Sequence, residues 1–186
     1  MNLSKRYAQW LEICRQWGED TEVATRIFDD LVRRYSTEKR HYHSLSHIEM
    51  MLSLAEQNQT AIKQWEATFF AVWFHDAIQG MLINGEQESA ELCQQSLAQL
   101  NVPNYISNTA FKMICATKHH TATCEADLGI FLDLDLAILG SPWPDYQKYA
   151  NKTRLEYAIP SWLFTRGRVD FLRKKLATTT IFNSQV

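Results

Sequence analysis

Several features of secreted, membrane-spanning and metal-ribbon proteins are scarce or missing in this chain of 186 residues. The four cysteines form no CxxC pair, and the N-terminal residues show no signal-peptide pattern. No apolar run approaches the ~20 residues that a helix needs to cross a bilayer. We therefore expect a cytoplasmic protein with free thiols that does not enter a membrane.

Glycine, proline and positive charge are also in short supply. Six glycines and four prolines are fewer than a chain rich in tight β-turns needs. The formal net charge of −2 argues against a broad nucleic-acid surface, which requires a basic excess, but leaves room for a small basic pocket that holds a phosphate. With 46% hydrophobic and 22% charged residues, the chain has the balance of an ordinary globular domain.

Apolar residues recur at helical spacing along most of the chain, which predicts an all-α fold. Near the N-terminus, Leu3, Tyr7, Trp10, Leu11 and Cys14 follow such a spacing. The expected helices span 3–17, 20–35, 46–58, 62–78, 86–100, 103–118, 127–139, 144–158 and 161–176, with a connector over 38–45 and a loose tail over 177–186. We expect one domain, residues 1–186, folded as a single compact helical bundle.

Two local patterns affect where polar side chains lie. Ser46 and Glu49 have the spacing of a capping box, which places His47 in the first turn of the helix that follows. Residues 127–139 are ambiguous, because they alternate like a strand but also suit a buried helix. We predict a helix there, because every neighbouring segment is helical and a lone strand would lack a partner.

The most informative stretch is residues 69–76, where six apolar residues run directly into His75 and Asp76. An ionised carboxylate and a histidine are costly beside an apolar run unless a partner offsets their desolvation, as a divalent metal ion does. Other ligand-type residues lie at or near expected helix ends: His43, His47, His119, His120, Asp133 and Asp135. A helical bundle could gather three or four of them around one ion and leave positions for water.

Four segments, in this order, resemble the HD superfamily of metal-dependent phosphohydrolases, and in particular a bacterial subgroup of predicted hydrolases. Residues 40–48 (RHYHSLSHI) are similar to the family's RxYHNxxHI segment, 71–77 (AVWFHDA) to AxWFHDA, 85–90 (GEQESA) to NExxSA, and 132–140 (LDLDLAILG) to LDxDLAILG. The resemblance covers roughly residues 20–175. Ser44 and Gly85 depart from it, each standing where the family has asparagine.

The resemblance implies an HD-type helical domain with a metal-site core over about 38–140 and C-terminal helices over 144–176. The implied metal ligands are His47, His75, Asp76 and Asp135, and Asp133 is the less favoured of the two aspartates in its segment. His43 matches the histidine that protonates the leaving oxygen. Glu86 matches a motif glutamate with a catalytic role, although the helix dipole favours an acid at a helix start in any case.

The implied function is hydrolysis of a phosphoester or phosphoanhydride of a nucleotide or other small phosphorylated metabolite. A divalent ion (Mn, Mg, Ni, Co, Fe or Zn) would provide metal-bound hydroxide to attack phosphorus. Lys118, Arg166 and Arg168 are candidates to hold a phosphate, and His120 to contact the phosphate or a second metal. A homodimer is compatible with the sequence.

Three other interpretations stay open. Some HD-fold proteins are di-iron oxygenases, which need extra histidines, and here only His119 and His120 lie between Asp76 and Asp135. A non-catalytic module could bind a nucleotide or a partner protein through an HD-like pocket. In a plain helical domain the four ligands would never converge.

Overall fold

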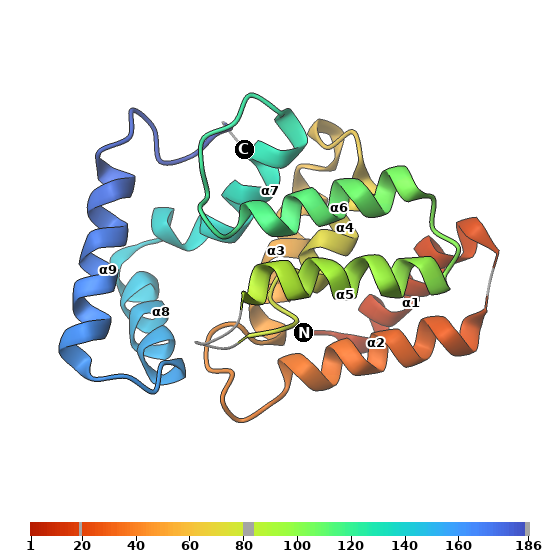
Figure 1. Ribbon diagram of the computed structural model, residues 1–186, viewed down its shortest axis with the longest axis horizontal. Coiled ribbons are helices and arrows are strands. Elements are labelled where there is room, and N and C mark those ends of the chain that lie inside the picture. Colours follow the sequence, from red (N-terminus) through yellow and green to blue (C-terminus); the bar gives the residue numbers. More distant parts are fainter. Residues whose placement is uncertain (19, 80–83, 185–186) are drawn as a thin grey trace.

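The computed structural model describes residues 1–18, 20–79 and 84–184 (Figure 1). The α-helices are α1 (Leu3–Cys14), α2 (Thr21–Tyr35), α3 (Leu45–Gln57), α4 (Trp65–Phe74), α5 (Gly85–Gln99), α6 (Asn104–Ala116), α7 (Ala126–Leu136), α8 (Trp143–Glu156) and α9 (Ser161–Leu176). Short 3-10 helices are η1 (Arg15–Trp17), η2 (Gln59–Ala61) and η3 (Ala137–Gly140). The predicted all-α fold is confirmed, since the described residues contain no strand.

Helix α4 forms the centre of the core. All of its residues from Ala67 to Phe74 are buried. Apart from Thr68, these residues are all apolar, so the helix is apolar around its whole circumference. Such a helix is stable only when other elements enclose it. Helices α3, α5, α6 and α7 all contact α4. The enclosed helix therefore carries His75, its C-cap residue, into the interior of the molecule.

Helices α1 and α2 cover α4 with aromatic side chains. The ring centroid of Trp10 lies 5.5 Å from that of Phe70, and the Trp10 indole N–H donates to the Ala24 carbonyl of α2 at 2.9 Å. Asn2 and Asp20 accept backbone N–H groups at the starts of α1 and α2 and so fix where these helices begin. The large buried rings supply much of the apolar area that stabilises this side of the bundle.

Helices α8 and α9 form a hairpin at one side of the molecule, with α9 outermost (Figure 1). Of the described residues, α9 buries none and α8 buries Thr153 alone. The hairpin is joined to the rest of the chain by specific polar contacts, such as the bond from Lys175 Nζ to the His120 carbonyl at 2.7 Å. No helix in the described ranges has both the length and the apolar character that crossing a bilayer requires.

The start of α3 differs from the prediction. The N-cap is Ser44, two positions before the predicted cap Ser46, so that α3 begins at Leu45. Ser44 has an extended backbone, and its carbonyl accepts the N–H groups of His47 and Ile48, which makes it the first residue of the helical hydrogen-bond pattern. His47 still lies in the first turn, as predicted.

Helix α4 is shorter than predicted at both ends, because it begins at Trp65 rather than at residue 62 and ends at Phe74 rather than at residue 78. Asp127 of α7 accepts the backbone N–H groups of Lys63 and Gln64, at 3.2 and 2.7 Å, just before α4 begins. The ambiguous segment over 127–139 is helical, as predicted, and continues from α7 into η3.

The C-terminal tail is not loose where it is described. The carboxylate of Asp133 accepts hydrogen bonds from the backbone and the side chain of both Asn183 and Ser184, at 2.6 to 3.0 Å. The tail can come this close because Gly129 has no side chain, and a Cβ there would lie 3.0 Å from the Asn183 Cβ. These bonds hold Asn183 and Ser184 against α7, so the tail predicted to be loose is anchored at these two residues, and residues 185–186 lie outside the described part.

Candidate metal centre

Three of the four predicted metal ligands converge on one point. His47 comes from the first turn of α3, His75 caps the end of α4, and Asp135 lies near the end of α7. The Nε2 atom of His47 is 3.3 Å from Nε2 of His75 and 3.1 Å from Oδ1 of Asp135, and the latter two atoms are 3.7 Å apart. One ligand atom from each residue lies within 4.8 Å of the others.

These spacings fit a divalent cation. Imidazole nitrogens and carboxylate oxygens bind zinc-like ions at about 2.0–2.2 Å, so two ligands of one ion lie roughly 3–4 Å apart. The side chains of His47 and His75 are almost fully buried, and that of Asp135 is 14% exposed. A bound cation would offset the cost of burying this donor set. His47, His75 and Asp135 could therefore hold a metal ion.

Asp76, the fourth predicted ligand, lies at the edge of this group. Its Oδ2 atom is 3.2 Å from Nε2 of His75 and 3.9 Å from Nε2 of His43. It is not one of the three residues whose ligand atoms are all mutually close. Asp76 thus stands between the cluster and His43.

Hydrogen bonds behind the ligands fix their orientation. Nδ1 of His75 donates to the Val72 carbonyl at 3.0 Å, so Nε2 faces the cluster. Nε2 of His120 lies 2.8 Å from Oδ2 of Asp135, the oxygen that His47 does not contact. His120 has a φ of 46°, which few non-glycine residues adopt. Hydrogen-bond partners such as the Val72 carbonyl and His120 orient metal ligands and tune the affinity for the metal.

The ionisation states within the cluster depend on one another. Burial lowers the pKa of His75, but Asp76 and Asp135 act against it and raise the pKa to about 9. Burial raises the pKa of Asp135, but hydrogen bonds from His120 and His47 hold it well below its usual range. His75 therefore carries a proton at neutral pH when nothing else binds its Nε2. A metal ion that binds this nitrogen has to displace the proton.

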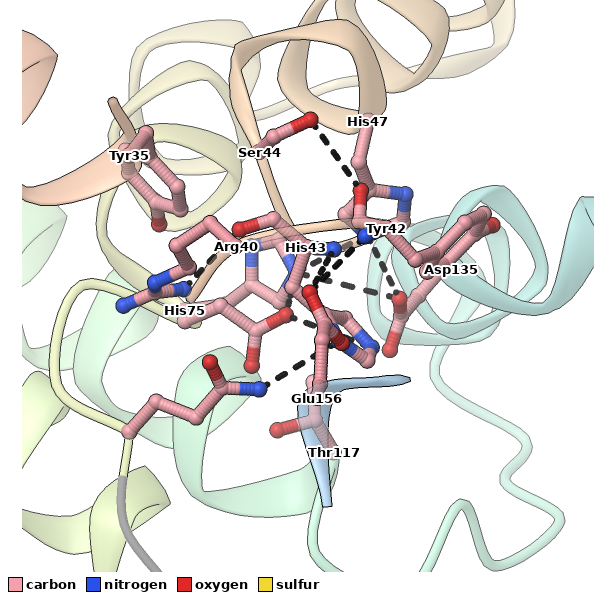
Figure 2. A network of polar contacts seen from close by, with 12 residues as sticks. Tyr35, Arg40, Tyr42, His43, Ser44, His47, His75, Thr117, Asp135 and Glu156 are labelled. Carbon is pink, nitrogen blue, oxygen red and sulfur yellow. Dashed lines mark hydrogen bonds and ion pairs between the residues drawn. The ribbon is translucent and has the colours of Figure 1, made fainter. Parts of the chain in front are cut away.

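His43, the predicted proton donor, lies beside the cluster and is held by Glu156 at the end of α8 (Figure 2). Oε1 of Glu156 accepts the backbone N–H groups of Tyr42 and His43 at 2.8 and 2.9 Å, and Oε2 is 2.5 Å from Nδ1 of His43. An ionised carboxylate only accepts, so Nδ1 carries a hydrogen and Nε2 is left facing Asp76. Burial lowers the pKa of His43, but Asp76 and Glu156 raise it by more.

The connector that carries His43 is fastened to the end of α4. The Arg40 guanidinium donates to the carbonyls of His43 and Ala77, at 3.0 and 3.3 Å, and lies 5.0 Å from the Tyr35 ring centroid. The Tyr35 hydroxyl in turn donates to the Trp73 carbonyl at 3.0 Å. Figure 2 shows Arg40 reaching across from the connector in this way. The backbone of His43 is thereby tied to the turn that follows His75 and Asp76.

Two other predicted residues, Glu86 and Lys118, form no hydrogen bond with the cluster among the described residues. Glu86 is in the first turn of α5, and it has no hydrogen bond or ion pair with the described cluster residues. Lys118 instead donates to the Asn84 side chain at 2.9 Å. Gly85 lies close to the backbone after α4, because a Cβ there would be 2.9 Å from the Ile78 carbonyl oxygen.

The predicted phosphate-binding residues of α9 differ in their surroundings. Arg166 is exposed. Arg168 lies with its guanidinium carbon 4.8 Å from the Tyr149 ring centroid and donates to the Tyr146 hydroxyl at 3.3 Å. His120 does reach the site, but through Asp135.

Sequence reasoning missed Glu156 and Tyr42. The Tyr42 ring centroid lies 5.1 Å from that of His47 and 4.4 Å from that of Tyr149. The position of Tyr42 directly before the candidate His43 was a usable signal. Glu156 offered none, because it lies 113 positions from His43 in the chain.

Comparisons with known proteins identified no relative of this chain. No family model, no curated protein and no solved structure matches the chain. Conclusions about function therefore depend on the geometry of the cluster and its surroundings.

Proposed function

We propose that the protein is a metal-dependent phosphohydrolase of the HD type. Its substrate would be a nucleotide or another small phosphorylated metabolite, cleaved at a phosphoester or phosphoanhydride bond. The observation that carries the proposal is the convergence of His47, His75 and Asp135, with Asp76 alongside, from helices far apart in the sequence. His43 stands next to this group, with its Nε2 atom 3.9 Å from Oδ2 of Asp76.

The donor set suits a divalent ion such as Mn, Fe, Co, Ni or Zn, because imidazole and carboxylate are good ligands for these ions, while Mg favours oxygen. His47, His75 and Asp135 would hold the ion, with Asp76 at its edge. A bound ion would supply Lewis acidity at the phosphoryl oxygens and lower the pKa of water toward ~7.

The neighbouring residues supply a proton donor. Asp76 and Glu156 raise the pKa of His43 above its ordinary value, which favours the protonated ring. Because Glu156 occupies Nδ1, the proton available for transfer is on Nε2, the side facing Asp76 and the cluster. Protonation of a departing oxygen by a positioned side chain is typically worth ~10²–10⁴-fold in rate.

The test is a screen of metals against substrates. The protein is stripped with a chelator, reloaded with Mn²⁺, Mg²⁺, Co²⁺, Ni²⁺, Fe²⁺ or Zn²⁺, and assayed for phosphate release from nucleotides and simple phosphoesters. We expect turnover with at least one ion. Asp135→Asn should lose both metal and turnover, and His43→Ala should keep its metal and lose ~10²–10⁴-fold in kcat. The exposed neighbour His41 provides the control variant His41→Ala.

Two results would contradict the proposal. One is the absence of phosphate release with every ion and substrate, and the other is full activity in Asp135→Asn. Tight nucleotide binding without turnover would identify a non-catalytic binding module instead.

One observation favours a second candidate, an HD-fold di-iron oxygenase. His120 lies 2.8 Å from Oδ2 of Asp135 while His47 lies 3.1 Å from Oδ1, so this carboxylate could bridge two ions. The candidate ranks second because a second iron needs more ligands, and the group found among the described residues holds three. Two irons per chain, together with oxygen consumption, would favour it over hydrolysis.

A further inference from the structure

His120 has an unusual backbone conformation at the edge of the metal cluster. Its φ of 46° lies in the left-handed region, which few residues other than glycine adopt. Its side chain is 13% exposed, and Nε2 lies 2.8 Å from Oδ2 of Asp135. A residue stays in such a conformation only where the surrounding structure fixes it. The contacts that fix His120 therefore also determine how Asp135 is held.

The helix before His120 holds its backbone N–H group. Helix α6 ends at Ala116, and the Ala116 carbonyl accepts the N–H of His120 at 3.0 Å. From residue 117 to residue 125, where α7 is about to begin, the chain is a loop without helix or strand. Loops are more mobile than the elements they connect. Contacts from outside the loop are needed to keep the His120 ring on Asp135.

Lys175, in the last turn of α9, supplies one such contact. Its Nζ atom donates to the His120 carbonyl at 2.7 Å, although the two residues are 55 positions apart in the chain. Lys175 is partly buried, whereas its neighbour Lys174 is exposed. A hydrogen bond from a charged donor is roughly twice as strong as one between neutral groups. The end of α9 thus fixes the His120 carbonyl, while α6 fixes its N–H.

The tail that follows α9 holds the next part of the same loop. The side-chain oxygen of Asn183 accepts the backbone N–H of Thr123 at 3.0 Å. The backbone and side-chain N–H groups of Asn183 donate to Asp133 of α7, at 2.8 and 3.0 Å. Asn183 therefore joins the loop to α7, two residues before Asp135. The segment over 175–184 holds the loop at two points, one at His120 and one at Thr123.

We propose that Lys175 is a positioning residue for the metal centre. By holding the His120 carbonyl it keeps the ring on Asp135, and it thereby sets the affinity of the cluster for a cation. An ionised carboxylate only accepts, so Nε2 of His120 donates to Oδ2 and leaves Oδ1, beside His47, for an ion. Loss of such a hydrogen-bond partner typically weakens metal binding ~10–100-fold. The inference rests on the metal centre of the proposed function and adds to it a residue of α9.

Binding of Co²⁺ to the full chain, after treatment with a chelator, tests this proposal. Competition with a coloured chelator gives the Kd, and the visible absorption of bound Co²⁺ reports how its ligands are arranged. Lys175→Met removes the ammonium group and keeps an unbranched side chain. We expect it to weaken Co²⁺ binding about tenfold, the lower end of the range for partners of metal ligands, and to change the Co²⁺ spectrum. The control Lys174→Met changes the exposed neighbour and should alter neither.

A double-mutant cycle shows whether Lys175 acts through His120. His120→Gly removes the ring at a position whose φ glycine adopts without strain, and it should weaken Co²⁺ binding ~10–100-fold. Adding Lys175→Met to this variant should then leave the Kd almost unchanged, because the contact with Asp135 is already lost. An equal loss from Lys175→Met in both backgrounds would overturn the proposal. So would a wild-type Kd in Lys175→Met, or a wild-type protein that binds no Co²⁺.

Hydrogen exchange of the metal-free protein separates a local effect from a general loss of structure. In Lys175→Met we expect faster exchange of the amides over 120–124, with the helices protected as in the wild type. Faster exchange throughout the chain would mean that Lys175 only stabilises the fold, and it would overturn the proposal. None of these measurements involves turnover. A protein that binds Co²⁺ as described but releases no phosphate would contradict the hydrolase proposal alone.

Discussion

At the scale of single residues, Glu156 decides which way His43 faces. Its carboxylate takes Nδ1 of His43 and two backbone N–H groups of the connector. Burial raises the pKa of Glu156, but His43 and the two N–H groups lower it by more, so the carboxylate stays ionised. A fixed negative charge on one side of the ring stabilises the imidazolium and presents its other N–H toward Asp76. Glu156 is thus a positioning residue for the proposed proton donor.

Replacing this carboxylate should alter the pH dependence of turnover. Glu156 raises the pKa of His43, so Glu156→Gln should lower it. His43 would then lose its proton at a lower pH, and the alkaline limb of the kcat–pH profile should move to lower pH. Profiles of the wild type and Glu156→Gln, with metal content measured in parallel, check this outcome. An unchanged alkaline limb at equal metal content would show that Glu156 has only a structural role.

The predictable part of the site was the set of ligands carried by regular elements. His47 and His75 are placed by helix ends, and their chemistry is visible in the local sequence, so their convergence with Asp135 could be anticipated. Glu156 could not be, because its partner is set by how the α8–α9 hairpin packs on the connector. The prediction that Arg166 holds a phosphate relied on charge alone and stays a prediction, because charge does not show which face of a helix turns toward the site.

At the scale of elements, a buried arginine joins α1 to α3. The side chain of Arg6 is 1% exposed and forms ion pairs with Glu49, at 2.7 Å, and with Glu56. Arg6 lowers the pKa of Glu49, and it lowers that of Glu56 by more than burial raises it. Both carboxylates are therefore ionised when this contact is intact. A charge buried this deeply is costly when a partner is lost, so the two helices depend on these carboxylates.

This contact predicts a loss of stability in acid. Carboxylates whose pKa is lower in the folded than in the unfolded state, where glutamate titrates near ~4.3, stabilise the fold above that pH. The contribution is lost as the pH falls through the lowered folded values. Glu56→Gln should therefore cost about 2 kcal/mol at pH 7, and less as the pH approaches 3.

Urea unfolding from pH 7 to pH 3 measures this difference. The control is Glu125→Gln, because Glu125 pairs with Lys112 where both side chains are more than half exposed. A surface pair of this kind is typically worth ~0–1 kcal/mol, so its removal should change stability little. A cost for Glu56→Gln that is constant across this pH range would contradict the electrostatic account.

Whether a segment is helical was easier to predict than which segments contact one another. Every segment around residues 127–139 was predicted to be helical, so a strand there would have had no partner, and the helix predicted instead is present. The bonds from the tail to Asp133 are polar, and they depend on the space beside Gly129, which carries no periodic signal. Contacts of this type can be seen only once the two segments are placed in space.

At the scale of the whole molecule, the cluster of His47, His75 and Asp135 connects three helices. It joins the start of α3, the end of α4 and the end of α7, and α4 is the helix that the others enclose (Figure 1). In the absence of another cation, a proton on His75 balances part of the local negative charge, since its pKa is about 9. A divalent ion would replace that proton with a stronger positive charge that three helices share.

Metal removal should therefore lower the melting temperature. An ion that binds only the folded chain stabilises it by about 2.7 kcal/mol at a free concentration of 100 times its Kd. For a chain of this length, each kcal/mol shifts Tm by roughly 2–4 °C, so saturation should raise Tm by roughly 5–11 °C over chelator-treated protein. Calorimetric scans with and without the ion, at a concentration set from its measured Kd, give the shift. Asp135→Asn should melt at the same temperature in both conditions, because its cluster lacks the carboxylate that joins α7 to the ion. An equal metal-dependent shift in this variant would place the ion elsewhere in the molecule.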